Sequence, residues 1–94
     1  MVFSGGDGQS LHAVRASDGV GVWTFPTQGD VRTPTVVGDT VFFGSSDSRL
    51  YGVDTATGAE RWSFAADAGL HKVTVVDNAA YVGGDDNVLY AVGI

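Results

Sequence analysis

The chain contains no cysteine, which excludes disulfide bonds, thiolate metal sites and cysteine nucleophiles. It also lacks long apolar runs, and no stretch approaches the roughly 20 residues that a membrane-spanning helix needs. The opening segment, residues 1–8, has neither a basic region nor an apolar stretch, so no signal peptide is visible in it. These absences predict a domain without covalent cross-links and without membrane insertion.

Positive charge is also scarce. Ten aspartates and one glutamate stand against four arginines and a single lysine, Lys72, which gives a formal net charge of −6. A surface of this kind repels phosphate backbones, so we expect no nucleic-acid partner. The acidic, lysine-poor composition is typical of halophilic proteins, and an ordinary acidic domain explains it equally well.

Helical periodicity is missing as well, although hydrophobic residues make up 44% of the chain. The β-branched runs 33–37 and 72–76 are typical of strands and end at turns rich in Gly, Asp and Asn. Further short strands are indicated where apolar segments open at residues 2, 41 and 80. The sequence therefore predicts an all-β chain.

The sequence repeats itself without gaps at a period of 39 residues. Residues 2–40 form repeat 1, residues 41–79 form repeat 2, and residues 80–94 form a truncated repeat 3. A period near 40 residues with strand-like content is typical of β-propeller blades. We predict a single partial propeller over residues 1–94, with about 2.4 four-stranded antiparallel blades. The positions that are identical in the first two repeats are Val2/Val41, Phe3/Phe42, Gly5/Gly44, Leu11/Leu50, Val14/Val53, Gly19/Gly58, Trp23/Trp62, Phe25/Phe64, Thr35/Thr74, Val36/Val75 and Val37/Val76.

The predicted strands fall into groups of three, four (33–64) and three (72–92), so the blades at both ends are incomplete. Closed rings of this architecture have about 4–8 blades, and an open array leaves a blade face and strand edges exposed. We expect these partial blades to be completed by the remaining blades of a larger parent propeller or by self-association. The first alternative makes this chain the C-terminal part of the parent, with a Met added by cloning.

A large aromatic residue follows a glycine turn at the same distance in both full repeats, with Trp23 after Gly19 and Trp62 after Gly58. An indole buries roughly 200 Å² and carries an N–H that a neighbouring backbone carbonyl can accept. We expect the turn glycine to determine where the ring lands, so that each tryptophan packs between blades. The small residues expected to make room for the rings are Ala13, Gly52 and Ala91.

At residues 50–64, LYGVDTATGAERWSF, the sequence resembles the PQQ-like β-propeller repeat, whose docking motif reads Ala/Gly-x-Asp-x-x-Thr-Gly-x-x-x-Trp. Repeat 1 carries Arg15 and Asp18 where the motif has Asp and Thr, and repeat 3 ends before the motif is complete. The positions that match the motif are Gly52, Asp54, Thr57, Gly58 and Trp62 in repeat 2, Ala13, Gly19 and Trp23 in repeat 1, and Ala91 in repeat 3.

The resemblance implies a fold more than an activity, because the family includes quinoprotein alcohol dehydrogenases, outer-membrane assembly lipoproteins and sensor domains without a cofactor. We predict a non-enzymatic segment that serves as a protein-interaction or structural scaffold within a larger surface or secreted protein. The alternatives are a fragment of a PQQ-dependent dehydrogenase and the sensor region of a membrane kinase. The extracytoplasmic location follows from the resemblance alone.

No constellation of catalytic residues stands out. His12 and His71 are not equivalent in the repeat, and no serine lies in a Gly-x-Ser-x-Gly elbow. The loops at 5–10 and 83–88 place Asp or Asn beside glycine, which raises a calcium hypothesis, but hairpin turns need these residue types without any metal. We therefore predict no catalytic and no metal-binding residues in this chain.

Three basic or titratable residues, Arg32, His71 and Lys72, precede the strands expected to be innermost, where the mouth of a central channel would lie. Solvated loop charges are the favoured interpretation, and contact with a cofactor is the alternative. We predict no cofactor-binding residue in this segment. PQQ and calcium are expected only if the parent protein is a dehydrogenase.

Overall fold

The computed structural model describes residues 2–5 and 9–93, and these form ten β-strands in three antiparallel sheets. The sheets have the strand orders β1-β2-β3, β4-β5-β6-β7 and β10-β9-β8, which confirms the predicted all-β partial propeller. This part of the chain contains no helix that is long and apolar enough to cross a membrane. The strands are β1 (Val2–Ser4), β2 (Ser10–Val14), β3 (Gly21–Pro26), β4 (Thr35–Val37), β5 (Thr40–Gly44), β6 (Arg49–Asp54), β7 (Glu60–Ala65), β8 (Leu70–Val76), β9 (Ala79–Gly84) and β10 (Leu89–Gly93).

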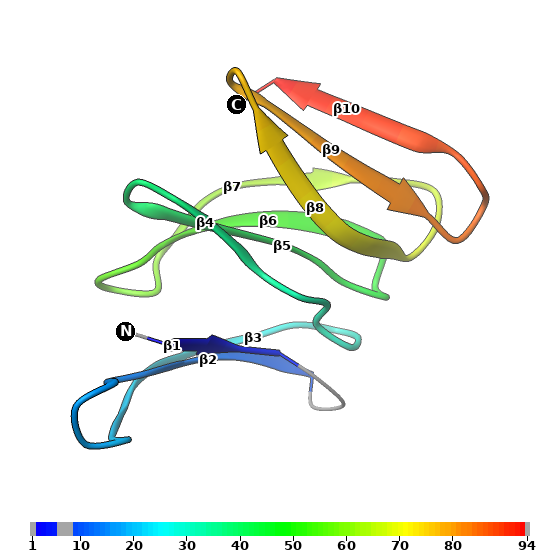
Figure 1. Ribbon diagram of the computed structural model, residues 1–94. Coiled ribbons are helices and arrows are strands. Elements are labelled where there is room, and N and C mark those ends of the chain that lie inside the picture. Colours follow the sequence, from blue (N-terminus) through cyan, green and yellow to red (C-terminus); the bar gives the residue numbers. More distant parts are fainter. Residues whose placement is uncertain (1, 6–8, 94) are drawn as a thin grey trace.

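The three sheets stack as layers, and the four-stranded sheet lies between the other two (Figure 1). The innermost strands β4 and β8 are neighbours, and the Thr35 hydroxyl donates a hydrogen bond of 2.7 Å to the Val73 carbonyl. Successive sheets therefore fan outward from a common inner edge, as propeller blades do. Counted from that edge, the first sheet has no strand equivalent to β4, and the third has none equivalent to β7.

Side chains of the middle sheet fill both interfaces because they alternate across its pleat. In β5, Phe43 packs in the cluster shared with the first sheet, and Phe42 packs in the cluster shared with the third. Four consecutive residues of this strand, Val41–Gly44, are buried, which is typical of a strand covered on both faces. The first cluster is formed by Leu11, Val31, Val41, Phe43, Tyr51 and Val53, and the second by Phe42, Leu50, Leu70, Val73, Ala80 and Val82.

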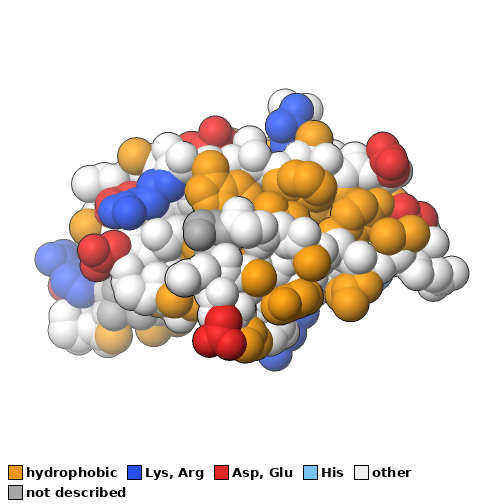
Figure 2. Space-filling view, turned by 90° about the horizontal axis from the view of Figure 1, so that it is seen from above, with side chains coloured by type: hydrophobic (Ala, Val, Ile, Leu, Met, Phe, Trp, Pro, Cys, Tyr) orange, Lys and Arg blue, Asp and Glu red, His pale blue; other side chains and the backbone are white. Residues whose placement is uncertain are grey.

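Equivalent leucines of the three repeats differ in burial. Leu11 and Leu50 are 0% exposed because each projects into the next sheet, whereas Leu89 is 69% exposed on the far side of the third sheet. Figure 2 looks onto this side of the molecule and shows hydrophobic side chains gathered across it. We call this surface the outer face of the third sheet; its exposed large hydrophobic residues include Val76, Tyr81 and Leu89.

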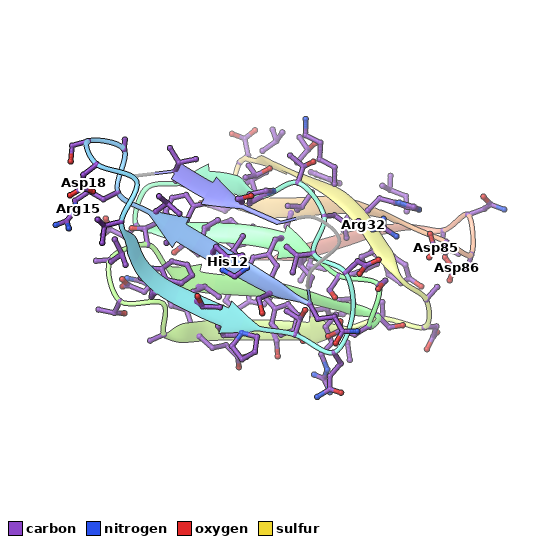
Figure 3. The ribbon with its side chains drawn as sticks, turned by 90° about the horizontal axis from the view of Figure 1, so that it is seen from below. His12, Arg15, Asp18, Arg32, Asp85 and Asp86 are labelled. Atoms are coloured by element: carbon purple, nitrogen blue, oxygen red, sulfur yellow. The ribbon has the colours of Figure 1, made fainter. Side chains whose placement is uncertain are left out.

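The opposite end of the stack is more polar. Ser4 and His12 occupy the outer face of the first sheet, where repeat 2 has the buried residues Phe43 and Tyr51. Figure 3 looks onto this face and shows His12 on it. The two end faces of the stack therefore differ in chemistry, although they come from one repeat.

The equivalent leucines provide a matched test of the layered packing. We expect Leu50→Ala to lower the free energy of unfolding by about 2–5 kcal/mol, since it opens a cavity between two sheets. The same change at exposed Leu89 is expected to cost less than about 0.5 kcal/mol. Urea unfolding followed by tryptophan fluorescence measures both values, and equal losses would contradict the arrangement.

Candidate functional site: the tryptophan docking seats

The Trp23 indole joins the first sheet to the second. Its Nε1 donates a hydrogen bond of 3.0 Å to the carbonyl oxygen of Thr55, in the turn between β6 and β7. The ring lies over Gly58, where a Cβ atom would come within 2.7 Å of the indole carbons. Gly58 also has a φ of 77°, so two independent constraints require glycine here. We call this arrangement the Trp23 seat.

Asp54 fixes the turn that receives the ring. Its Oδ1 accepts hydrogen bonds from the backbone N–H groups of Ala56 and Thr57, at 2.8 and 3.1 Å, and its Oδ2 pairs with the Arg61 guanidinium. The Arg61 hydrogen bond, followed by the two backbone bonds, lowers the pKa of Asp54 from 3.8 to about 2. The backbone carbonyl of Asp54 also accepts the N–H of Gly58. The carboxylate thus holds the turn in the form that Trp23 contacts.

The Trp23 contact corrects one prediction made from the sequence. The spacing within each repeat suggested that a turn glycine positions the tryptophan four residues later in the same repeat. Instead, Gly58 of repeat 2 receives Trp23 of repeat 1. Sequence spacing could not show this, because the two residues lie on different sheets and meet only when the sheets stack.

Trp62 occupies the equivalent position on the middle sheet, facing the third. It is partly buried against the second core cluster, and its ring centroid lies 5.8 Å from that of Phe42. It lines a shallow hollow with Val37, Thr40, Phe42, Arg61 and Asn78. The residue equivalent to Thr55 is Ile94, which lies outside the described residues. We call this hollow the Trp62 seat.

Small residues stand opposite both indoles in the sheets. Ala13 pairs with Trp23 and Gly52 pairs with Trp62, and a register shift follows each of these two positions. Ala91 pairs instead with Tyr81, since the described part of the third sheet has no outer strand. The first two pairings give each ring room beside its own sheet.

The turn of repeat 1 has a different chemistry. Asp18 accepts hydrogen bonds from the Arg15 Nε and the Val20 N–H, at 3.1 and 3.0 Å, and Gly19 has a φ of 72°. Nothing in the described chain lies within 4 Å of a Cβ built on Gly19. The backbone shape of the turn is therefore retained without the ring that covers Gly58.

A tyrosine–aspartate bond at the hairpin tips is a device that the sequence reasoning missed. The Tyr51 hydroxyl donates to Asp47 at 2.7 Å, and the Tyr90 hydroxyl donates to Asp86 at 2.8 Å. Burial, together with the Asp47 bond, raises the pKa of Tyr51, and the Asp86 bond raises that of Tyr90. The signal was present as an Asp-x-x-x-Tyr spacing that recurs after 39 residues.

The two histidines lie on different sheets. His12 Nδ1 is 3.3 Å from the Thr24 hydroxyl, and His71 Nε2 is 2.6 Å from an Asp85 oxygen. No group of three or more metal-ligating side chains occurs within residues 2–5 and 9–93. In the loop at 83–88, the Asp86 carboxylate accepts the Val88 N–H, a turn contact. Most of the loop at 5–10 lies outside the described residues.

Arg32, His71 and Lys72, which the sequence placed before the innermost strands, line one hollow. Arg32 precedes β4, and the other two residues belong to the start of β8. The hollow also contacts the edge of the first sheet through Phe3 and Ser4. The structure therefore brings together three residues that are up to 40 positions apart in sequence.

The two turn glycines offer a matched test of the Trp23 seat. We expect Gly19→Ala to cost about 1–2 kcal/mol, the backbone penalty of a left-handed conformation. Gly58→Ala should cost about 1–3 kcal/mol more, since its methyl group collides with the indole. Urea unfolding compares the two variants, and a Gly58→Ala loss no larger than that of Gly19→Ala would contradict the seat.

The depressed pKa of Asp54 predicts a pH dependence of stability. Because its pKa is about 2 in the folded chain and 3.8 ordinarily, the ionised carboxylate stabilises the fold above pH 4. That contribution is lost as the pH falls from 4 towards 2. Asp54→Asn should therefore be less stable than the wild type at pH 6, and the difference should shrink by pH 2. Urea midpoints at several pH values measure it, with Asp77→Asn as the control for loss of charge.

Comparison with known proteins supports the propeller geometry. BamB from Moraxella catarrhalis superposes with a TM-score of 0.82 at 24% sequence identity, and the match covers 97% of this chain and 29% of that one. The computationally designed Ika4 and Ika8 proteins superpose with TM-scores of 0.87 and 0.86 at 16% identity, over 98% of this chain and over 59% and 30% of theirs. These likenesses establish the fold alone. No curated protein matches the chain.

The sequence also matches a family model, PQQ_2, which is described as outer membrane protein assembly factor BamB. The match extends over residues 1–93, and so includes both tryptophans and all three sheets. With the docking geometry and the three-layer fold, this match identifies the chain as a member of the BamB-like family of PQQ-type β-propeller repeats.

Proposed function

We propose that the chain is a non-enzymatic segment of a larger β-propeller and serves there as a scaffold for protein contacts. The repeats 2–40, 41–79 and 80–94 are its proposed units. The observation that carries the proposal is the outer face of the third sheet, which keeps the side chains used for docking at the other two interfaces. Leu89 on this face is 69% exposed, whereas its equivalent Leu50 is 0% exposed.

A glycine series supports the same conclusion. A Cβ atom at Gly5 would lie 2.8 Å from the Val31 carbonyl oxygen, and one at Gly44 would lie 2.5 Å from that of His71. At the equivalent Gly83, nothing in the described chain lies within 4 Å. The third sheet thus has the glycine that admits a following segment, so a further blade is the occupant that fits its outer face.

A second copy of the chain fits this face less well. Head-to-tail stacking would set Leu89 against the first sheet of the next copy, where Ser4 and His12 replace the buried Phe43 and Tyr51. Smaller and more polar side chains would leave that interface underfilled. The remaining blades of a parent protein are therefore the proposed partner, with self-association as the alternative.

The docking residues have a structural role in this proposal. Trp23, Thr55 and Gly58 join successive blades, and Asp54 and Thr57 shape the receiving turn; none of them is assigned to catalysis. The family description names an outer membrane protein assembly factor, which supports an extracytoplasmic location and protein partners. We propose no cofactor for this segment.

Charge placed on the outer face of the third sheet tests the docking proposal. An exposed apolar face promotes association, so the wild-type chain is expected to exceed its monomer mass of 9.7 kDa in light scattering. Leu89→Asp should shift the average mass towards the monomer. Thr24→Asp, on the polar end face, should leave the mass unchanged. A wild-type monomer, or equal effects of the two changes, would count against the docking face.

The dehydrogenase alternative calls for a separate measurement. Titration of the parent protein with PQQ and calcium should leave the quinone absorbance spectrum and the melting temperature unchanged. A saturable spectral change with a raised melting temperature would replace the scaffold proposal with a cofactor-dependent one. That result would not affect the docking face, which the light-scattering comparison tests.

A further inference from the structure

A hollow beside β1 concentrates positive charge on an otherwise acidic molecule. We call it the basic hollow; its polar and charged side chains come from Ser4, Arg32, Thr33, His71 and Lys72, and no Asp or Glu lines it. In Figure 3, Arg32 lies alongside β8 in the view from below. With a formal net charge of −6, the chain places two of its five Lys and Arg residues here.

These two cations are not neutralised within the described chain. Arg15 pairs with Asp18 and Arg61 pairs with Asp54, but neither Arg32 nor Lys72 forms an ion pair with a described residue. Two like charges that converge without a carboxylate repel one another, and an anion placed between them removes that repulsion.

Arg32 supplies a second, independent observation. Its Nε is buried, and within residues 2–5 and 9–93 it has no hydrogen-bond partner. A buried N–H without an acceptor is costly, and guanidinium groups bind carboxylate and phosphate oxygens with paired, charge-assisted hydrogen bonds. The missing acceptor is therefore an oxygen atom that carries negative charge.

We propose that the basic hollow binds a carboxylate or phosphate group through Arg32 and Lys72. The Ser4 and Thr33 hydroxyls are the neutral polar groups of the wall. His71, which Asp85 holds at 2.6 Å, is the third basic side chain that lines the hollow. This site goes beyond the scaffold role, since it needs neither a further blade nor a second copy.

The anion has two sources that the geometry allows. One is a small free oxyanion that enters the hollow alone. The other is an acidic side chain of an extended peptide, because β1 pairs only with β2 and leaves its other edge open beside the hollow. Peptides add to such edges through backbone hydrogen bonds. Both sources present the same oxygen atoms to Arg32.

Nuclear magnetic resonance of the 94-residue chain tests the site directly. The Arg32 Nε–Hε signal is identified by its loss in Arg32→Gln and is followed during titration with sodium phosphate, succinate and an acetylated triaspartate peptide. Sodium chloride at matched ionic strength is the reference. We expect a saturable shift with at least one of the three probes and only a small, linear drift with chloride.

Substitutions establish where the anion binds. Arg32→Gln, monitored through the Lys72 signals, should weaken binding about tenfold or more, as expected for loss of a charge-assisted contact. Arg49→Gln is the matched control, because Arg49 also forms no ion pair with a described residue but lines a different groove. It should alter the affinity less than about twofold. If Arg32→Gln unfolds, Lys72→Gln decides by the same criterion, read from the Arg32 signal.

The probes also separate the two sources. Saturation by phosphate or succinate supports a free oxyanion. Saturation by the peptide alone, with shifts of the β1 backbone amides, supports an extended acidic partner. Linear drift with all three probes, or equal losses of affinity in the Arg32 and Arg49 variants, would overturn the proposal.

Discussion

The fold depends on the packing of each sheet face against the next. Sheets of three or four strands have little stability alone, and here each obtains its core from a neighbour. The Trp23 seat concentrates this dependence in one contact, where the indole covers a glycine on the adjacent sheet and donates a hydrogen bond to the Thr55 carbonyl. The apolar ring supplies area, and the N–H fixes its position. Asp54 contributes from below by holding the turn in shape.

The same dependence explains the two ends of the stack. A repeat that docks through one face and receives through the other leaves one face of each kind uncovered when the array is short. The outer face of the third sheet has kept the residues that dock, and Leu89 is exposed as a result. The outer face of the first sheet has Ser4 and His12 in place of large buried residues. This asymmetry makes a further blade a better neighbour for the third sheet than a second copy.

Particular residues show how far the sequence could be interpreted. Period-2 patterns and turn residues predicted the strands, and the 39-residue period predicted equivalent sheets. The sequence also placed Arg32, His71 and Lys72 near one another, and the structure brings them to one hollow. It did not show that Trp23 meets Gly58, nor that Asp47 accepts the Tyr51 hydroxyl. Both contacts depend on side-chain positions that backbone pairing and sheet stacking establish.

By itself, the sequence determined the strand content, the repeat and the family resemblance, because these follow from local side-chain patterns along the chain. Only the tertiary structure decided which face of each sheet docks, which glycine receives which ring and which basic groups lack a partner. Those properties are relations between segments about 39 residues apart, and they exist only when the sheets are stacked. A leucine of one repeat and its equivalent in another are identical in sequence, and only the presence of a neighbouring sheet buries one and exposes the other.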